Sequence, residues 1–239
     1  MMSMNFKDSL LSIVLPTYNE RENLPSITDE IASLLKRIVK YEIIIVDDNS
    51  PDGTGRIADE LSKNNGNVKV VYRPGKMGLS SALIDGIKVA NGDIVVVLDS
   101  DLQHPPKLLH TLLDEIANGG DLVIASRYVN GGCINRWTKW RKIVSKCATL
   151  FVHVSLPNIK GVKDPLSGYF VFRRSFVDGM RLRGMGCKLL LEILAKGKWK
   201  RIVEVPYMFE SRQRGKSKLK FKDYADFVKL ILYLARSKE

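Results

Sequence analysis

The sequence predicts an α/β fold in which a mostly parallel central sheet is covered by helices. Short apolar runs rich in β-branched residues alternate with segments whose apolar residues have helical spacing. Polar loops with glycine or proline separate many of these segments. A chain of 239 residues, 45% of them hydrophobic, can bury the core of one such domain. We therefore expect a single domain over 1–239.

The first elements follow from the apolar pattern. The run 11–16 predicts a strand that ends at Pro16, and 24–40 has the spacing of a helix. A strand over 42–46 and a helix over 56–62 are expected next, followed by a strand over 68–72. This is the alternation of a parallel sheet.

The next elements continue the alternation. A helix is expected over 80–90, with Asn91-Gly92 as its C-terminal cap, and a buried strand over 94–98. Pro105-Pro106 predicts the start of a helix that reaches Ala117, and 122–126 predicts a further strand.

The pattern changes after Arg127. The segments 168–172 and 202–209 are expected to be strands, and 221–235 an amphipathic helix. The segment 136–156 begins with Trp137 and Trp140 among four basic residues, a composition typical of a membrane-interface anchor. An exposed helix start with two core tryptophans is the alternative.

The charge of the chain favours anionic partners. Its net charge is +12, and six basic residues but no acidic one lie between Ser211 and Lys222. Three scattered cysteines fit neither a disulfide framework nor a zinc site, and no apolar stretch is long enough to span a bilayer. Because we find no signal peptide, we expect a cytoplasmic setting.

Polar side chains follow three of the expected parallel strands and should meet at one edge of the sheet. They are Tyr18 and Glu20, Asp47 and Asp48, and Asp99, Asp101 and Gln103. Such an acidic edge is unfavourable unless a cation or donor-rich ligand compensates it, and oxygen ligands suit Mg²⁺ or Mn²⁺. Taken alone, Asp99-Ser100-Asp101 is equally consistent with a turn that caps a helix. Arg127, Arg212 and Lys218 could face a diphosphate from the basic side.

Five segments, in order along the chain, resemble the family 2 glycosyltransferases: 13–20, 46–53, 75–79, 99–106 and 126–128. The segments 164–170 and 212–218 make the sequence most similar, within this family, to the dolichyl-phosphate mannosyltransferases. The resemblance implies a GT-A type, Rossmann-like nucleotide-sugar fold with amphipathic helices on a membrane surface. It also implies a nucleotide-sugar-binding half over 1–127, an acceptor-binding half over 128–220 and a C-terminal amphipathic helix over 221–239.

The resemblance also implies roles for individual residues. Those expected to bind the nucleotide sugar are Pro16, Tyr18, Glu20, Val46, Asp48, Asp99, Ser100, Asp101, Arg212 and Lys218. Asp101 and Gln103, with Asp99, are the expected ligands of Mg²⁺ or Mn²⁺. Arg127, Arg141 and Ser145 are expected to hold the acceptor phosphate, and Asp99, Asp101 and Arg127 to act in catalysis.

The expected reaction is an inverting transfer of mannose from GDP-mannose to dolichyl or another polyprenyl phosphate. The expected site is the cytosolic face of a membrane, to which the protein binds peripherally, with a small membrane-anchor subunit as a further possible partner. A transferase that uses UDP-glucose or a similar donor is the closest alternative. A basic nucleic-acid-binding protein is a remote one, because the chain contains no recognised nucleic-acid motif.

Overall fold

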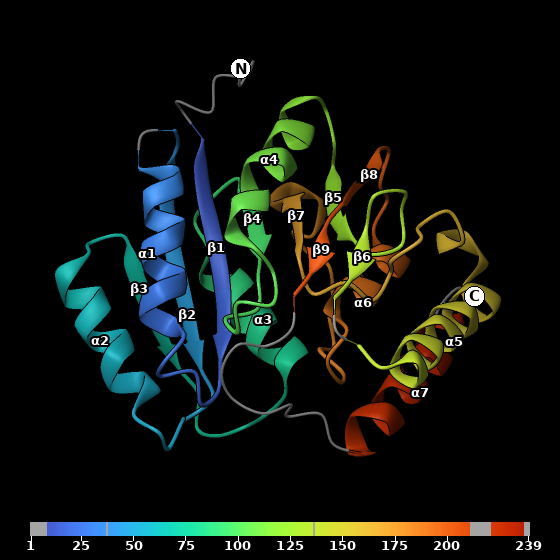
Figure 1. Ribbon diagram of the computed structural model, residues 1–239, viewed down its shortest axis with the longest axis horizontal. Coiled ribbons are helices and arrows are strands. Elements are labelled where there is room, and N and C mark those ends of the chain that lie inside the picture. The colour runs from blue at the N-terminus through green and yellow to red at the C-terminus, as the bar shows by residue number, and fades with distance from the viewer. Residues whose placement is uncertain (1–8, 37, 136, 211–220, 237–239) are drawn as a thin grey trace.

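The structure is a computed structural model, and it describes residues 9–36, 38–135, 137–210 and 221–236. In this part of the chain, seven strands form the central sheet: β1 (Leu10–Thr17), β2 (Lys40–Asp47), β3 (Val68–Tyr72), β4 (Ile94–Val97), β5 (Leu122–Ser126), β7 (Phe170–Arg173) and β8 (Ile202–Pro206). Their order is β3-β2-β1-β4-β7-β5-β8. All neighbouring pairs are parallel except those of β7, which is antiparallel to both β4 and β5. The predicted α/β fold with a mostly parallel sheet is confirmed (Figure 1).

The helices cover both faces of this sheet. They are α1 (Leu24–Leu35), α2 (Thr54–Asn64), α3 (Leu79–Val89), α4 (Leu109–Ala117), α5 (Lys139–Ser155), α6 (Leu189–Lys196) and α7 (Phe221–Arg236), with short 3₁₀ turns at η2 (Pro106–Leu108), η3 (Pro157–Ile159) and η4 (Arg174–Phe176). Buried residues of α1 and α4 pack on one face, and those of α3, α6 and α7 on the other. The β-branched strands supply both cores, because alternate side chains point to opposite faces.

Two small features complete the arrangement. Strands β6 (Cys133–Ile134) and β9 (Met208–Phe209) pair in parallel beside the main sheet, and α5 lies against α7 at one end of the molecule (Figure 1). No helix among the described residues is long and apolar enough to cross a membrane.

Several predicted boundaries were wrong. The first helix ends at Leu35 rather than at residue 40, because β2 already begins at Lys40. The expected strand over 202–209 is two strands in different sheets. They separate after Pro206, which has no N–H to donate, and the N–H of Tyr207 donates to the Ser126 carbonyl at 3.2 Å. The helix α6 and the strand β6 were not predicted.

The turn after α3 differs from the prediction in its mechanism. Gly92 is not a left-handed cap, since its φ is not positive. Instead its N–H donates to Ser12 Oγ at 2.8 Å, and a Cβ there would lie 2.5 Å from the Leu10 carbonyl oxygen. The same hydroxyl donates to the buried Glu42 carboxylate at 2.6 Å, which also binds Lys69 Nζ at 2.6 Å. Position 92 therefore requires glycine because the backbone of Leu10 lies too close to leave room for a Cβ.

Candidate active site

The candidate site lies at the carboxyl edge of the parallel strands. The chain runs outward from β1 to β3 and then returns to β4 on the other side of β1, so the strand order reverses between β1 and β4. Ligands of open α/β sheets bind at such a reversal. The described non-glycine residues with positive φ are Asn19, Asn49 and Leu102, and they lie in the loops after β1, β2 and β4. Unusual backbone conformations of this kind concentrate at functional sites.

The loop after β1 is held against its neighbours by polar contacts. Pro16 lies opposite Val46 in the β1–β2 register, and its carbonyl accepts a hydrogen bond of 2.8 Å from Ser100 Oγ. The Lys76 ammonium lies 4.7 Å from the centroid of the Tyr18 ring. These contacts bring together residues from four of the segments on which the family resemblance rests.

Glu20, in the same loop, is buried. Its carboxylate accepts a hydrogen bond from Asn23 Nδ2 at 2.7 Å, and its backbone N–H donates to Thr54 Oγ1 at 2.9 Å. The loop after β1 is therefore tied to the start of α2.

Asp48, after β2, forms a buried ion pair with Arg73, which follows β3. Burial raises the pKa of the Asp48 carboxyl, and the Arg73 guanidinium opposes that rise. The expected acidic edge is therefore compensated at Asp48 by an arginine of the chain itself. Arg73 could have been found by the rule that located the acids, because it follows the neighbouring parallel strand in the same way.

The turn after β4 carries the acidic pair. Asp101 is 6% exposed, and its Oδ1 accepts the Gln103 N–H at 3.1 Å. Gln103 Nε2 donates to the Glu210 carbonyl at 3.0 Å, which fixes the amide and leaves its oxygen as a possible ligand. No cluster of three His, Cys, Asp or Glu side chains in the described ranges could hold a metal ion by itself. Carboxylate and amide oxygens are nevertheless the donor types that Mg²⁺ and Mn²⁺ prefer, so Asp99, Asp101 and Gln103 stay the candidate ligands.

Asp99 is linked to an aromatic cluster through His104. The Asp99 carboxylate, 29% exposed, lies 3.4 Å from His104 Nε2, and His104 Nδ1 is hydrogen-bonded to Tyr207 Oη at 3.0 Å. Burial raises the pKa of the Tyr207 phenol. A Cβ on Gly168 would lie 2.8 Å from Asp99 Oδ2, so a larger residue there would force the Asp99 carboxylate to move.

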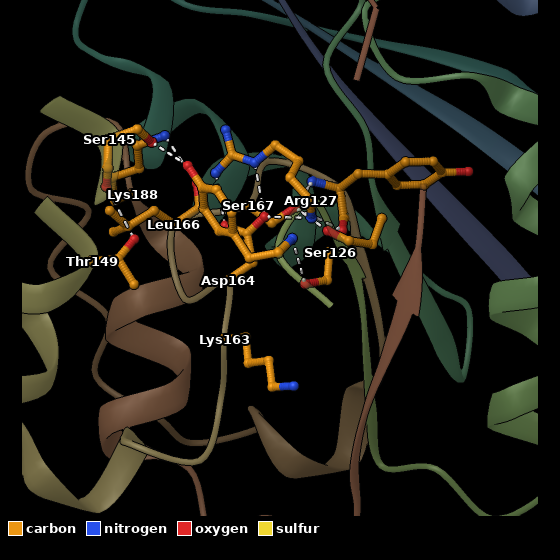
Figure 2. Close-up of polar contacts among 12 residues, drawn as sticks. Ser126, Arg127, Ser145, Thr149, Lys163, Asp164, Leu166, Ser167 and Lys188 are labelled. Carbon is orange, nitrogen blue, oxygen red and sulfur yellow. Dashed lines mark hydrogen bonds and ion pairs between the residues drawn. The ribbon is translucent and has the colours of Figure 1, made fainter. Parts of the chain in front are cut away.

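Arg127, after β5, is held by Asp164 (Figure 2). The Arg127 Nε and Nη2 atoms donate to the two carboxylate oxygens at 2.8 and 2.7 Å, and its backbone N–H donates at 2.9 Å. Asp164 is fully buried, and Arg127 is 8% exposed. Burial alone would lower the pKa of Arg127, but the bonds and charge of Asp164 outweigh it and raise the pKa. The guanidinium is therefore cationic and fixed in direction.

The other two predicted acceptor residues lie on α5. Ser145 Oγ accepts a hydrogen bond of 2.8 Å from the hydroxyl of Tyr128, the residue after Arg127. The Arg141 guanidinium lies 4.1 Å from the centroid of the Trp137 ring. The start of α5 thus packs next to the end of β5.

Some predictions fall outside this geometry. Arg212 and Lys218 lie outside the described residues, as does Arg136. The sequence pattern assigned no role to Arg73, His104, Tyr128 or Tyr207. Asp164 was named only as part of a segment that resembles the family. Its position shortly before an apolar strand was the one sequence feature that could have indicated a role.

Comparison with known proteins identifies the family. A family model described as glycosyl transferase family 2 matches residues 12–179. The chain belongs to this family. It is 46% identical to a dolichol-phosphate mannosyltransferase of Pyrococcus furiosus over 226 residues, which are 95% of this chain and 64% of that protein. It is 36% identical to a polyprenol monophosphomannose synthase of Mycolicibacterium smegmatis over 216 residues, which are 87% of this chain and 80% of that protein.

Solved structures support the GT-A fold. A glucosyl-3-phosphoglycerate synthase of Mycobacterium tuberculosis, crystallised with Mn²⁺, UDP-glucose and phosphoglyceric acid, superposes with a TM-score of 0.70 at 20% identity. The match covers 96% of this chain and 79% of that chain. The predicted family and fold are thus confirmed, and at this identity the structural likeness extends to the fold alone.

Proposed function

We propose that this protein transfers mannose from GDP-mannose to dolichyl or another polyprenyl phosphate, releasing GDP. The observation that carries the proposal is that an acidic turn and a buried arginine lie at the same edge of the sheet. The Asp99–Asp101 turn follows β4, and the buried Arg127–Asp164 pair follows β5, a strand that runs in the same direction as β4. The names of the two sequence relatives support the same reaction.

On this proposal the half 1–127 binds the donor. Pro16, Tyr18, Glu20, Val46 and Asp48 form the base and ribose pocket, and Asp99, Ser100 and Asp101 contact the nucleotide. Arg212 and Lys218 complete the set at the donor diphosphate. The half 128–220 binds the acceptor, and 221–239 is a C-terminal amphipathic segment.

Asp101 and Gln103, with Asp99, would hold Mg²⁺ or Mn²⁺ at the turn after β4. A bound divalent cation stabilises the negative charge that develops on the departing nucleoside diphosphate. The oxygen donors of these three side chains fit such an ion, and the Mn²⁺ of the structurally similar synthase is consistent with it.

The acceptor needs little activation in this reaction. A polyprenyl monophosphate is anionic at neutral pH, so a strong general base is unnecessary, and the protein contributes mainly by positioning. Arg127, fixed by Asp164, would direct the phosphate oxygen toward the anomeric carbon together with Arg141 and Ser145. A single displacement inverts the anomeric configuration, so an α-linked donor gives a β-linked lipid product.

The surface of α5 and α7 suggests how the lipid is reached. Large apolar side chains on α5 are exposed, among them Trp140 at 73%, Leu150 at 63% and Val154 at 71%, and Leu232 on α7 is 50% exposed. Basic residues at the start of α5 accompany them. We propose that these helices lie on the cytosolic surface of a membrane. A small membrane-anchor subunit that covers this apolar face is the alternative.

A donor panel tests the proposed reaction. Purified protein with Mg²⁺ or Mn²⁺ and a short polyprenyl phosphate is given GDP-mannose, UDP-glucose or UDP-galactose, and lipid-linked sugar is measured. Transfer from GDP-mannose, abolished by Asp101→Ala, is the expected result. Transfer only from a UDP-sugar would replace GDP-mannose as donor, and no transfer from any donor would overturn the proposal.

A further inference from the structure

One donor near the proposed acceptor site has no hydrogen-bond partner among the residues that the structure describes. The indole N–H of Trp137 is buried and makes no hydrogen bond with any residue of the described ranges. Buried indole N–H groups usually find a partner, because an unmade hydrogen bond in a dry environment costs free energy. Trp137 belongs to the segment between β6 and α5, so it lies immediately before the helix that carries Arg141 and Ser145.

The surroundings of Trp137 indicate what the missing partner is. The Arg141 guanidinium carbon lies 4.1 Å from the centroid of the indole ring, and that of Arg127 lies 5.8 Å from it. Phe209 contacts the ring edge-to-face at a centroid distance of 5.5 Å. Two cations beside one aromatic ring repel each other, and the negative ring face offsets part of that repulsion. An unpaired N–H beside two guanidinium groups suits an anion that accepts hydrogen bonds.

Trp140 provides the contrast. It lies one helical turn further on and is 73% exposed, whereas Trp137 packs against the core through Phe209. The sequence pattern grouped the two tryptophans as one membrane anchor. The structure separates them, so Trp137 needs a different role.

We infer that Trp137 is a residue of the acceptor-phosphate site. Its indole N–H donates to an oxygen of the bound phosphate monoester, and its ring holds the Arg141 guanidinium near Arg127. The residue thereby links the two arginines that the proposed function assigns to the acceptor, and the inference rests on that proposal. The group that this site would recognise is a monophosphate, whether it is carried by a lipid or free in solution.

Steady-state kinetics test this with three variants. Trp137→Phe keeps a ring but removes the N–H, and Trp137→Leu removes both. Trp199→Phe is the matched control, because it also removes an indole N–H, one that donates to the Ile193 carbonyl away from the proposed site. We expect Trp137→Phe to raise the KM for a short polyprenyl phosphate by about tenfold, the effect of one hydrogen bond to a charged group, with the KM for GDP-mannose unchanged. Trp137→Leu should raise it further, and Trp199→Phe should match the wild type. Equal KM values for the acceptor in Trp137→Phe and Trp199→Phe, or a parallel rise in both substrates' KM, would overturn the inference.

A second measurement leaves Trp137 intact. The chain has 3 tryptophans, so Trp140→Phe combined with Trp199→Phe makes Trp137 the sole emitter. Farnesyl phosphate should change its fluorescence, farnesol should not, and inorganic phosphate should compete if the free anion suffices. No change with farnesyl phosphate refutes the inference. Because this assay needs no sugar transfer, it decides the role of Trp137 even if the proposed reaction fails.

Discussion

Replacing Asp164 with asparagine should damage both the fold and the acceptor site. Asp164 is fully buried and accepts three hydrogen bonds from Arg127, two of them from the guanidinium. Asparagine has nearly the same shape, but it lacks the negative charge and has only one acceptor oxygen. Its amide NH₂ would face guanidinium donors. The change therefore leaves a buried cation without its counter-charge.

The size of the effect follows from this burial. Removing one partner of a buried ion pair costs about 3–5 kcal/mol. Domains have a free energy of unfolding of about 5–15 kcal/mol, so the loss is a large share of the total. In a chain of this length each kcal/mol corresponds to a fall in Tm of about 2–4 °C. We also expect a higher KM for the lipid phosphate, because Arg127 would no longer be fixed in direction.

Urea unfolding followed by circular dichroism measures the first effect. A double-mutant cycle with Arg127→Met and Asp164→Asn provides the control, since residues in direct contact should show a coupling energy well above about 0.5 kcal/mol. A loss below about 1 kcal/mol for Asp164→Asn, or additive single changes, would refute the reasoning about this pair.

Three further predictions concern other parts of the molecule. Gly168→Ala would bring a Cβ within 2.8 Å of the Asp99 carboxylate, so that carboxylate must move. We therefore expect kcat to fall about 10- to 100-fold with little change in Tm. An unchanged kcat would contradict this. The double variant Leu150→Ser/Val154→Ser changes the exposed face of α5 and should reduce co-sedimentation with anionic liposomes. The free energy of unfolding should stay within about 0.5 kcal/mol of the wild type per site. Undiminished liposome binding would exclude this face as the membrane-binding surface. Burial by itself would raise the pKa of Glu42, but the hydrogen bonds to its carboxylate and the charge of Lys69 outweigh burial. The net effect is a lowered pKa. Its stabilising effect should therefore be present at neutral pH and be lost as the pH falls through the lowered pKa, so the stability difference between wild type and Glu42→Gln should shrink in acid; a constant difference between about pH 7 and pH 3 would refute it.

The strands of the first half could be predicted from sequence because each contains a short run dominated by apolar residues. The predicted strands over 68–72 and 122–126 match β3 and β5 at both ends. The rule that parallel strands end at a common edge also placed the loops after β1, β2 and β4 together, as the sheet order confirms. Helix ends were less accurate, since the apolar spacing that predicts a helix over 24–40 continues into the start of β2.

Which charged residues form pairs could not be predicted in the same way, although the rule that located the acids also places Arg73 at the same edge. Asp48 and Arg73 are 25 residues apart in sequence, and Arg127 and Asp164 are 37 apart. Their contacts depend on which strands are neighbours, and apolar periodicity carries no information about that. The division between Trp137 and Trp140 likewise depends on the packing of Phe209, which comes from the far end of the chain.

Strand β7 joins the two sides of the site, and its direction in the sheet could not be predicted from the sequence. Because β7 runs antiparallel to β4 and β5, its amino-terminal end lies at the edge where the parallel strands have their carboxyl ends. The loop that precedes it therefore reaches both sides at once. Asp164 binds Arg127 after β5, and Gly168 passes beside Asp99 after β4. Between them, Ser167 Oγ donates to the Ala125 carbonyl of β5 at 2.7 Å (Figure 2). A parallel β7 would have taken this loop to the opposite edge, leaving Arg127 without its carboxylate. Strand β7, which is antiparallel to both of its neighbours, is thus the feature of the fold that holds the proposed donor and acceptor residues in register.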